Sequence, residues 1–213
     1  MPKLEAATQL LWSARTGTLI LADSATTLFF VVDSPNDRLL TILPGTIIKP
    51  ATSPDDQTIL DGTLFIPRED DDALQLHVQA TALTEQQAGH AADRFAAHHG
   101  MAHKGSYVEI TIRGGKFDGV VLDDEDLDLS NPFLEGGHEA KLLRQLNTDK
   151  AHLAKLAQQL LGFEVFKPLA VATDPRGIHL RTRAGIYRLP FTPTAETANV
   201  AANRITELMR ANG

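Results

Sequence analysis

The sequence contains no cysteine. This absence excludes thiolate catalysis, cysteine-ligated zinc or iron–sulfur clusters, and disulfide bonds. No stretch approaches the roughly 20 consecutive apolar residues of a membrane-spanning helix, and the first residues lack the long apolar core of a signal peptide. We therefore expect a cytoplasmic protein that does not enter a membrane.

Several recurrent catalytic motifs are also missing. The sequence has no Gly-rich loop that would cradle a phosphate, no nucleophile elbow and no metalloprotease helix motif. Its 213 residues suffice for one large domain or two small ones, and a core of this size needs no metal for folding. Nothing in the sequence therefore specifies hydrolysis, and no metal site is predicted.

Charge is distributed unevenly along the chain, whose net charge is −7. Residues 1–137 carry 9 Lys/Arg against 21 Asp/Glu, whereas residues 138–213 carry 11 against 6. Such opposite signs suit either docking of the two halves or an anionic ligand held by the second half. The acidic total argues against non-specific binding to nucleic acid.

The first half reads mainly as β-structure after a short helix over residues 4–15. Apolar runs separated by turn clusters predict strands at residues 18–22, 27–32, 38–43, 58–66 and 74–83. A helix should begin after Thr84 and stop at Gly100. Strands at residues 107–112 and 120–122, split by Gly114 and Gly115, follow it. This pattern is typical of an antiparallel barrel.

A domain boundary is expected in the acidic run at residues 123–128 and the turn-rich residues 130–137. Beyond it the pattern predicts one amphipathic helix over residues 139–161, three strands at 165–173, 177–182 and 185–190, and a last helix over 195–211 capped by Thr194. The predicted fold class is α+β. An antiparallel split β-barrel domain (residues 1–130) precedes a small α/β domain of helix, three strands and helix (residues 138–213).

Four segments in this order carry a family resemblance. They are Ser-Ala-Arg-Thr-Gly-Thr-Leu at 13–19, Leu-Leu-Arg-Gln-Leu-Asn-Thr-Asp-Lys at 142–150, Asp-Pro-Arg-Gly-Ile-His-Leu at 174–180 and Arg-Leu-Pro-Phe at 188–191. Together they resemble the pyridoxamine 5'-phosphate oxidase-like, FMN-binding split-barrel family, and within it the HugZ-like heme-binding and heme-degrading branch with an appended C-terminal α/β domain. The resemblance implies a role in iron metabolism and a homodimer that holds FMN or heme in clefts at or near its interface.

The sequence departs from that family at two places. Where flavin-binding members carry phosphate ligands, residues 43–50 offer only Thr46 and Lys49, and two prolines remove N–H donors. The sequence thus favours heme over FMN. Relatives commonly have histidine where this chain has Lys150, and an ammonium cannot ligate iron. We interpret Lys150 as a structural contact to the acidic barrel domain.

Two groups of residues are candidates for cofactor binding. His98, His99 and His103 are candidate axial ligands, because imidazole is a natural ligand of heme iron. The alternative is that histidines at a helix C-terminus complement the helix dipole and stay in water. The candidate donors to heme propionates are Arg181, Arg183 and Arg188, although an ordinary solvated sheet face explains them as well. No catalytic residue is predicted.

The leading hypothesis is a heme-binding protein of the HugZ-like split-barrel type, and the residues leave open whether it degrades or traffics heme. If the protein is an enzyme, it is a heme oxygenase-like or a flavin-dependent oxidoreductase. Two alternatives come from other classes. One is an FMN-dependent oxidoreductase, and the other is a cofactor-free regulator that binds a partner protein.

Overall fold

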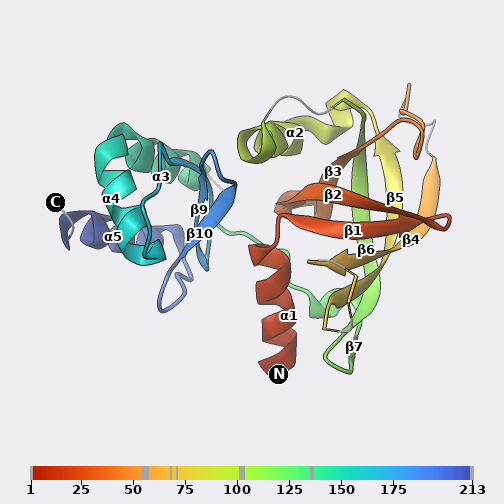
Figure 1. Ribbon diagram of the computed structural model, residues 1–213, viewed down its shortest axis with the longest axis horizontal. Coiled ribbons are helices and arrows are strands. Elements are labelled where there is room, and N and C mark those ends of the chain that lie inside the picture. The colour runs from red at the N-terminus through yellow and green to blue at the C-terminus, as the bar shows by residue number, and fades with distance from the viewer. Residues whose placement is uncertain are drawn as a thin grey trace. The chain divides into compact units, whose positions relative to one another are not determined.

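The structure is a computed structural model that describes residues 2–53, 58–67, 69–70, 72–100, 104–134 and 137–211. The chain divides into two compact units, Met1–Ser130 and Asn131–Gly213. The first unit is a closed antiparallel barrel, and the second is a small sheet packed with helices (Figure 1). This element order confirms the predicted α+β fold.

Six strands close the barrel, because β3 pairs with β6 as well as with β2 in the order β3-β2-β1-β4-β5-β6. A seventh strand extends the sheet beside β6. The strands are β1 (Thr16–Leu21), β2 (Ser24–Asp33), β3 (Arg38–Leu43), β4 (Ile59–Ile66), β5 (Leu74–Leu83), β6 (Ser106–Phe117) and β7 (Val120–Leu122). Each of the six barrel strands thus has a partner on both sides, which removes the free edges that would attract other chains.

Strand β6 corrects one prediction. It continues through Gly114 and Gly115, which were expected to separate a strand at residues 107–112 from one at 120–122. A Cβ atom on Gly115 would lie 2.4 Å from the carbonyl oxygen of Gln75 on β5. Glycine therefore permits the close approach of two backbones at this point rather than ending the strand.

Two helices pack on the barrel. Helix α1 (Pro2–Ser13) buries Leu11 and Trp12 in the barrel core, and the Trp12 indole donates a hydrogen bond of 2.8 Å to the carbonyl of Asp128. Helix α2 (Glu85–His99) forms a separate apolar cluster against β2 and β3 through Phe95. It begins at Thr84, as predicted, with a capping box.

The acidic run at residues 123–128, which was expected to form part of the domain boundary, packs against the barrel through its apolar side. A short 3₁₀ helix, η2 (Asp124–Asp126), opens the segment, and Leu127 and Leu129 then lie buried in the barrel core. The acidic side chains point into solvent while the leucines fill the core. The run is thus part of the barrel unit.

The second unit contains a three-stranded antiparallel sheet in the order β10-β9-β8 with three helices packed against it (Figure 1). Its elements are α3 (His138–Thr148), α4 (Lys150–Leu161), β8 (Leu169–Asp174), β9 (Gly177–Arg181), β10 (Ile186–Pro190) and α5 (Ala198–Ala211). Leu146, Leu156, Ile178 and Ile205 are fully buried in its core. No helix among the described residues is long and apolar enough to span a membrane.

Helix boundaries in this unit differ from the prediction at two places. The expected single helix over residues 139–161 breaks at Asp149, whose carboxylate accepts a hydrogen bond of 2.9 Å from the backbone N–H of His152 and caps α4. The last helix begins at Ala198, with the Thr197 hydroxyl accepting from the N–H of Val200, and not after Thr194. Both starts follow from side-chain oxygens that satisfy the first free N–H groups.

Candidate functional site

The Asn-Thr-Asp-Lys segment at residues 147–150 is explained by the backbone it contacts. The Asn147 side chain donates a hydrogen bond of 2.8 Å to the carbonyl of Ala170 and accepts one of 2.9 Å from its N–H. The Asn147 amide therefore makes the two hydrogen bonds to Ala170 that a neighbouring strand would make at the edge of β8. Asp149 then caps α4, so Lys150 occupies the first helical position.

Lys150 lines a cavity of about 720 Å³ in the second unit. The lining residues come from the start of α4, the approach to β8, and the turn after β9: Lys150, Ala151, Ala154, Lys167, Pro168, Leu169, Arg181, Thr182 and Arg183. Four of these side chains are cationic, and none of the described lining residues is acidic. The volume lies within the range of small-molecule pockets, and the charge suits a carboxylate or phosphate ligand.

The two arginines are placed by a tight turn. Arg181 ends β9 opposite Leu169 of β8. The hydroxyl of Thr182 donates to the carbonyl of Gly185 at 3.1 Å and accepts from the N–H of Ala184 at 3.0 Å. The Thr182 hydroxyl thus acts as both donor and acceptor within the turn that carries Arg183. These two hydrogen bonds fix the backbone of the turn beside the cavity.

Lys167 is placed by its backbone. Its φ of 49° lies in the left-handed region, which residues other than glycine seldom adopt. Pro168 follows directly and is buried, so the chain turns there into β8. A residue other than glycine keeps this strained backbone conformation only where the surrounding structure enforces it. Lys150, Lys167 and Arg183 have no carboxylate partner among the residues that the structure describes.

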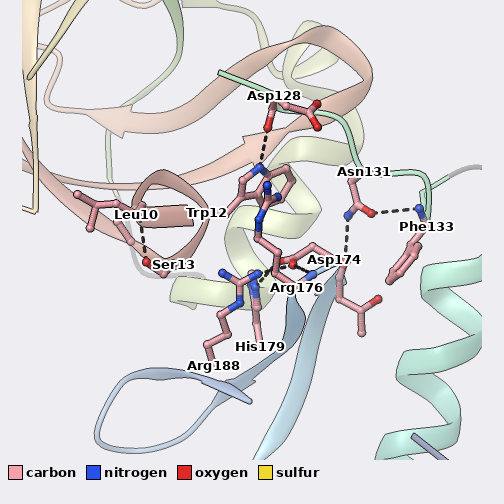
Figure 2. Close-up of polar contacts among 12 residues, drawn as sticks. Leu10, Trp12, Ser13, Asp128, Asn131, Phe133, Asp174, Arg176, His179 and Arg188 are labelled. Atoms are coloured by element: carbon pink, nitrogen blue, oxygen red, sulfur yellow. Dashed lines mark hydrogen bonds and ion pairs between the residues drawn. The ribbon is translucent and has the colours of Figure 1, made fainter. Parts of the chain in front are cut away.

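A buried ion cluster lies on the same sheet (Figure 2). The carboxylate of Asp174 is fully buried, 2.7 Å from Nε2 of His179, and it also binds Nη2 of Arg188 and the backbone N–H of Arg176. Burial alone would raise the pKa of Asp174, but the charges and hydrogen bonds of His179 and Arg188 hold it well below its usual range. Burial also lowers the pKa of Arg188 despite its contact with Asp174.

The cluster changes how two sequence predictions are understood. Arg188 was a candidate propionate donor, yet it is bound to Asp174 and is not among the residues that line the cavity. A solvated sheet face was the alternative for these arginines, but the Arg188 side chain is only 14% exposed and His179 beside it is 3% exposed. Of the three predicted arginine donors, the structure brings Arg181 and Arg183 together at the cavity.

The predicted histidine ligands belong to the first unit. His98 is 3% exposed, and its Nδ1 lies 2.9 Å from the carbonyl oxygen of Arg94. His99 packs between Phe29 and Phe95, with Nε2 lying 3.1 Å from the carbonyl of Phe30. The expectation that these rings stay in water is wrong for His98.

These contacts assign the protons on both rings. A carbonyl only accepts, so the bonded nitrogen is Nδ1–H in His98 and Nε2–H in His99. His103 lies outside the described residues. Each of the two described candidates therefore has one ring nitrogen engaged with a backbone carbonyl of the barrel unit.

The residues that line the cavity suit the propionates of a heme but not its iron. The cations of the cavity match the two propionates. Heme iron is held in proteins by imidazole, thiolate, thioether or phenolate groups, and none of the described lining residues carries one. The predicted donors and the predicted axial ligands thus belong to two different units.

Residues 43–50, where flavin-binding members of the resembled family carry phosphate ligands, form a turn. The carbonyl of Pro44 accepts hydrogen bonds from the N–H groups of Ile47 at 2.9 Å and Ile48 at 3.4 Å. Thr46 and Lys49 are exposed. Two backbone amides of this segment, those of Ile47 and Ile48, are therefore engaged within the turn and are not free to bind a phosphate.

Comparisons with known proteins address the fold. No family model matches the sequence, and no curated protein is similar enough to count as a relative. A structure of a protein of unknown function from Agrobacterium tumefaciens is similar at 18% identity and a TM-score of 0.70, covering 98% of this chain and 95% of that one. A heme-binding protein from Mycobacterium smegmatis aligns over 99% and 97% at 14% identity, with a TM-score of 0.41. The first similarity supports the barrel-plus-α/β fold along the whole chain.

Sequence reasoning missed two of the four cavity cations. Lys150 was noted as a departure from a motif but was interpreted as a contact to the barrel. Lys167 gave no signal, because its place depends on a left-handed backbone that the sequence does not announce. The break at Asp149 was the one local feature that would have placed Lys150 at a helix start.

Proposed function

We propose that this protein binds a tetrapyrrole dicarboxylate, with heme as the ligand, through the cation-lined cavity of its second unit. One observation carries the proposal: four cationic side chains from three separate segments surround one cavity of about 720 Å³. The sequence resemblance to the HugZ-like branch supplies the choice of heme among anionic ligands.

The lining suits both halves of such a ligand. Arginine guanidinium groups bind carboxylates in a two-pronged geometry, and Arg181 and Arg183 supply two of them. Ala154, Pro168 and Leu169 provide apolar surface for the macrocycle. A bound heme would supply a redox-active iron. The residues of this chain bind and orient the ligand, and no catalytic step is assigned to them.

The axial ligand, the oligomeric state and the partners remain predictions. The resemblance proposes His98, His99 or His103 for the iron and a homodimer as the assembly. An FMN-dependent activity and a regulatory contact with a partner protein remain the alternatives. The engaged backbone of the Pro44 turn favours the tetrapyrrole over FMN.

An absorbance titration with hemin tests the proposal. The wild-type protein should give a saturable, stoichiometric Soret change, which Lys167→Ala and Arg183→Ala should each weaken about tenfold by removing one charge-assisted contact. Lys155→Ala is the matched control, because Lys155 is exposed on α4 and does not line the cavity. Absence of saturable binding, or equal weakening by the control, would contradict the proposal. A yellow protein with bound flavin would favour the FMN alternative.

A further inference from the structure

We infer that the cavity recognises its tetrapyrrole by the carboxylates and not by the iron, so that a metal-free porphyrin binds as tightly as heme. This inference rests on the proposed function. It concerns the class of ligand, which becomes anionic tetrapyrroles with or without a metal.

The first step is the set of side chains at the cavity. Two lysines, two arginines and a threonine provide its polar groups, and the remaining described lining residues are apolar. Lysine side chains are protonated near neutral pH in water, and neither an ammonium nor a guanidinium has a lone pair for iron. The Thr182 hydroxyl is already engaged with Gly185 and Ala184. The cavity thus offers donors to oxygen anions and no ligand for a metal.

The second step concerns the histidines of the same unit. His179 is buried and bound to Asp174. His138 is exposed at the start of α3. His152 lies on the first turn of α4, which begins at Lys150. None of these three lines the cavity. The described histidines of the second unit therefore leave the cavity without an imidazole.

The third step concerns the position of Lys150. It is the first residue of α4, and Asp149 fixes the start of that helix. An imidazole at this position would bring a lone pair to the cavity wall, whereas the native side chain brings a positive charge. Residue 150 therefore determines whether the cavity can distinguish a metalloporphyrin from a metal-free one.

Three ligands test this inference on the full-length protein: hemin, metal-free protoporphyrin IX and its dimethyl ester. We expect the dissociation constants of the first two to agree within about threefold, read by absorbance and by porphyrin fluorescence. The ester, whose carboxylates are blocked, should bind at least about tenfold more weakly. A wild-type protein that binds hemin more than about tenfold tighter than protoporphyrin IX would overturn the inference alone. Failure of both to bind would contradict the proposed function as well.

The variant Lys150→His sharpens the test. It should make hemin binding tighter than protoporphyrin IX binding and shift the Soret band, because it adds an iron ligand at the wall. Lys155→His, also on α4 but away from the cavity, should leave the two affinities equal. An unchanged ratio in Lys150→His would contradict the placement of the ligand at this wall.

Discussion

Among the residues that the structure describes, each unit holds a largely buried ion cluster, and these two clusters have opposite compositions. In the barrel, Arg38 lies between two carboxylates, 2.7 Å from Asp33 and 2.6 Å from Glu109. In the second unit, the carboxylate of Asp174 lies between His179 and Arg188 (Figure 2). The acidic unit thus buries a net negative cluster, and the cationic unit buries a net positive one when His179 is protonated.

The two clusters also differ in the strands that they connect. Arg38 ties β3 to β2, to β6 and, through the carbonyl of Gln87, to α2. These strands are already joined by the closed barrel ladder. Asp174, the last residue of β8, binds His179 in the middle of β9 and Arg188 in the middle of β10. Among the described residues, β8 is an edge strand of this sheet. We infer that the small sheet depends more on side-chain contacts than the barrel does.

The strongest test of this comparison is Asp174→Ala. The change leaves two cationic groups buried without their carboxylate, and breaking a buried ion pair in this way costs about 3–5 kcal/mol. Chemical denaturation, monitored by hydrogen exchange of the amides in the second unit, should show this decrease in the free energy of unfolding. Glu196→Ala, at an exposed position of the same unit, is the control and should change little. A loss of less than about 1 kcal/mol would contradict the dependence of the sheet on this cluster.

Arg38→Met should destabilise the barrel by about 3 kcal/mol, less than the change at Asp174. The smaller effect is expected because the Glu109 side chain is 24% exposed and can be hydrated when its partner is removed. Thermal unfolding of both variants under the same conditions compares them. Arg113→Met, an exposed position on β6, serves as the control. A larger loss at Arg38 than at Asp174 would reverse the comparison.

Acidification should weaken the second unit. The pKa of Asp174 lies below its unfolded value, so its contribution is complete above about pH 4 and is lost as the pH falls toward the folded pKa. By pH 2.5 the expected loss is about 1–2 kcal/mol, because a carboxyl whose folded pKa is lowered loses about 1.4 kcal/mol of stabilisation for each pH unit below its unfolded pKa. Hydrogen exchange in the second unit, measured between pH 5 and pH 2.5, reports it. Asp174→Asn should flatten this dependence, and an equally steep curve in that variant would assign it to other groups.

The same comparison explains what the sequence could predict. Apolar runs bounded by turn clusters predicted β3 and β5 with the observed bounds, because both signals are visible locally in the sequence. The break at Asp149 was missed because the leucine stripe continues on both sides of it, from Leu146 to Leu153. The ion cluster at Asp174 was missed because its members lie 5 and 14 residues away and meet only through the pairing of strands.

The candidate site shows the same limit. Arg181 and Arg183 were found from the alternation along one strand, but their partners at the cavity come from a helix start and a left-handed turn. Such placements depend on which side chains cap a helix and on how a loop is held by its neighbours. A pattern of residue types along the chain does not contain that information.

The smallest expected effect tests whether side-chain hydrogen bonds complete the edge of β8 where no described strand pairs with it. Asn147→Ala removes the two hydrogen bonds to Ala170, which is itself 3% exposed, and should destabilise the second unit by about 1–2 kcal/mol. Exchange of the Ala170 amide should rise more than that of β9 amides, because β9 keeps a strand on each side. Gln145→Ala on the same helix is the control, since its bond to Thr206 is exposed. An unchanged exchange rate at Ala170 would mean that the edge of β8 is protected by packing alone, and the side chains of α3 would then not replace a missing strand.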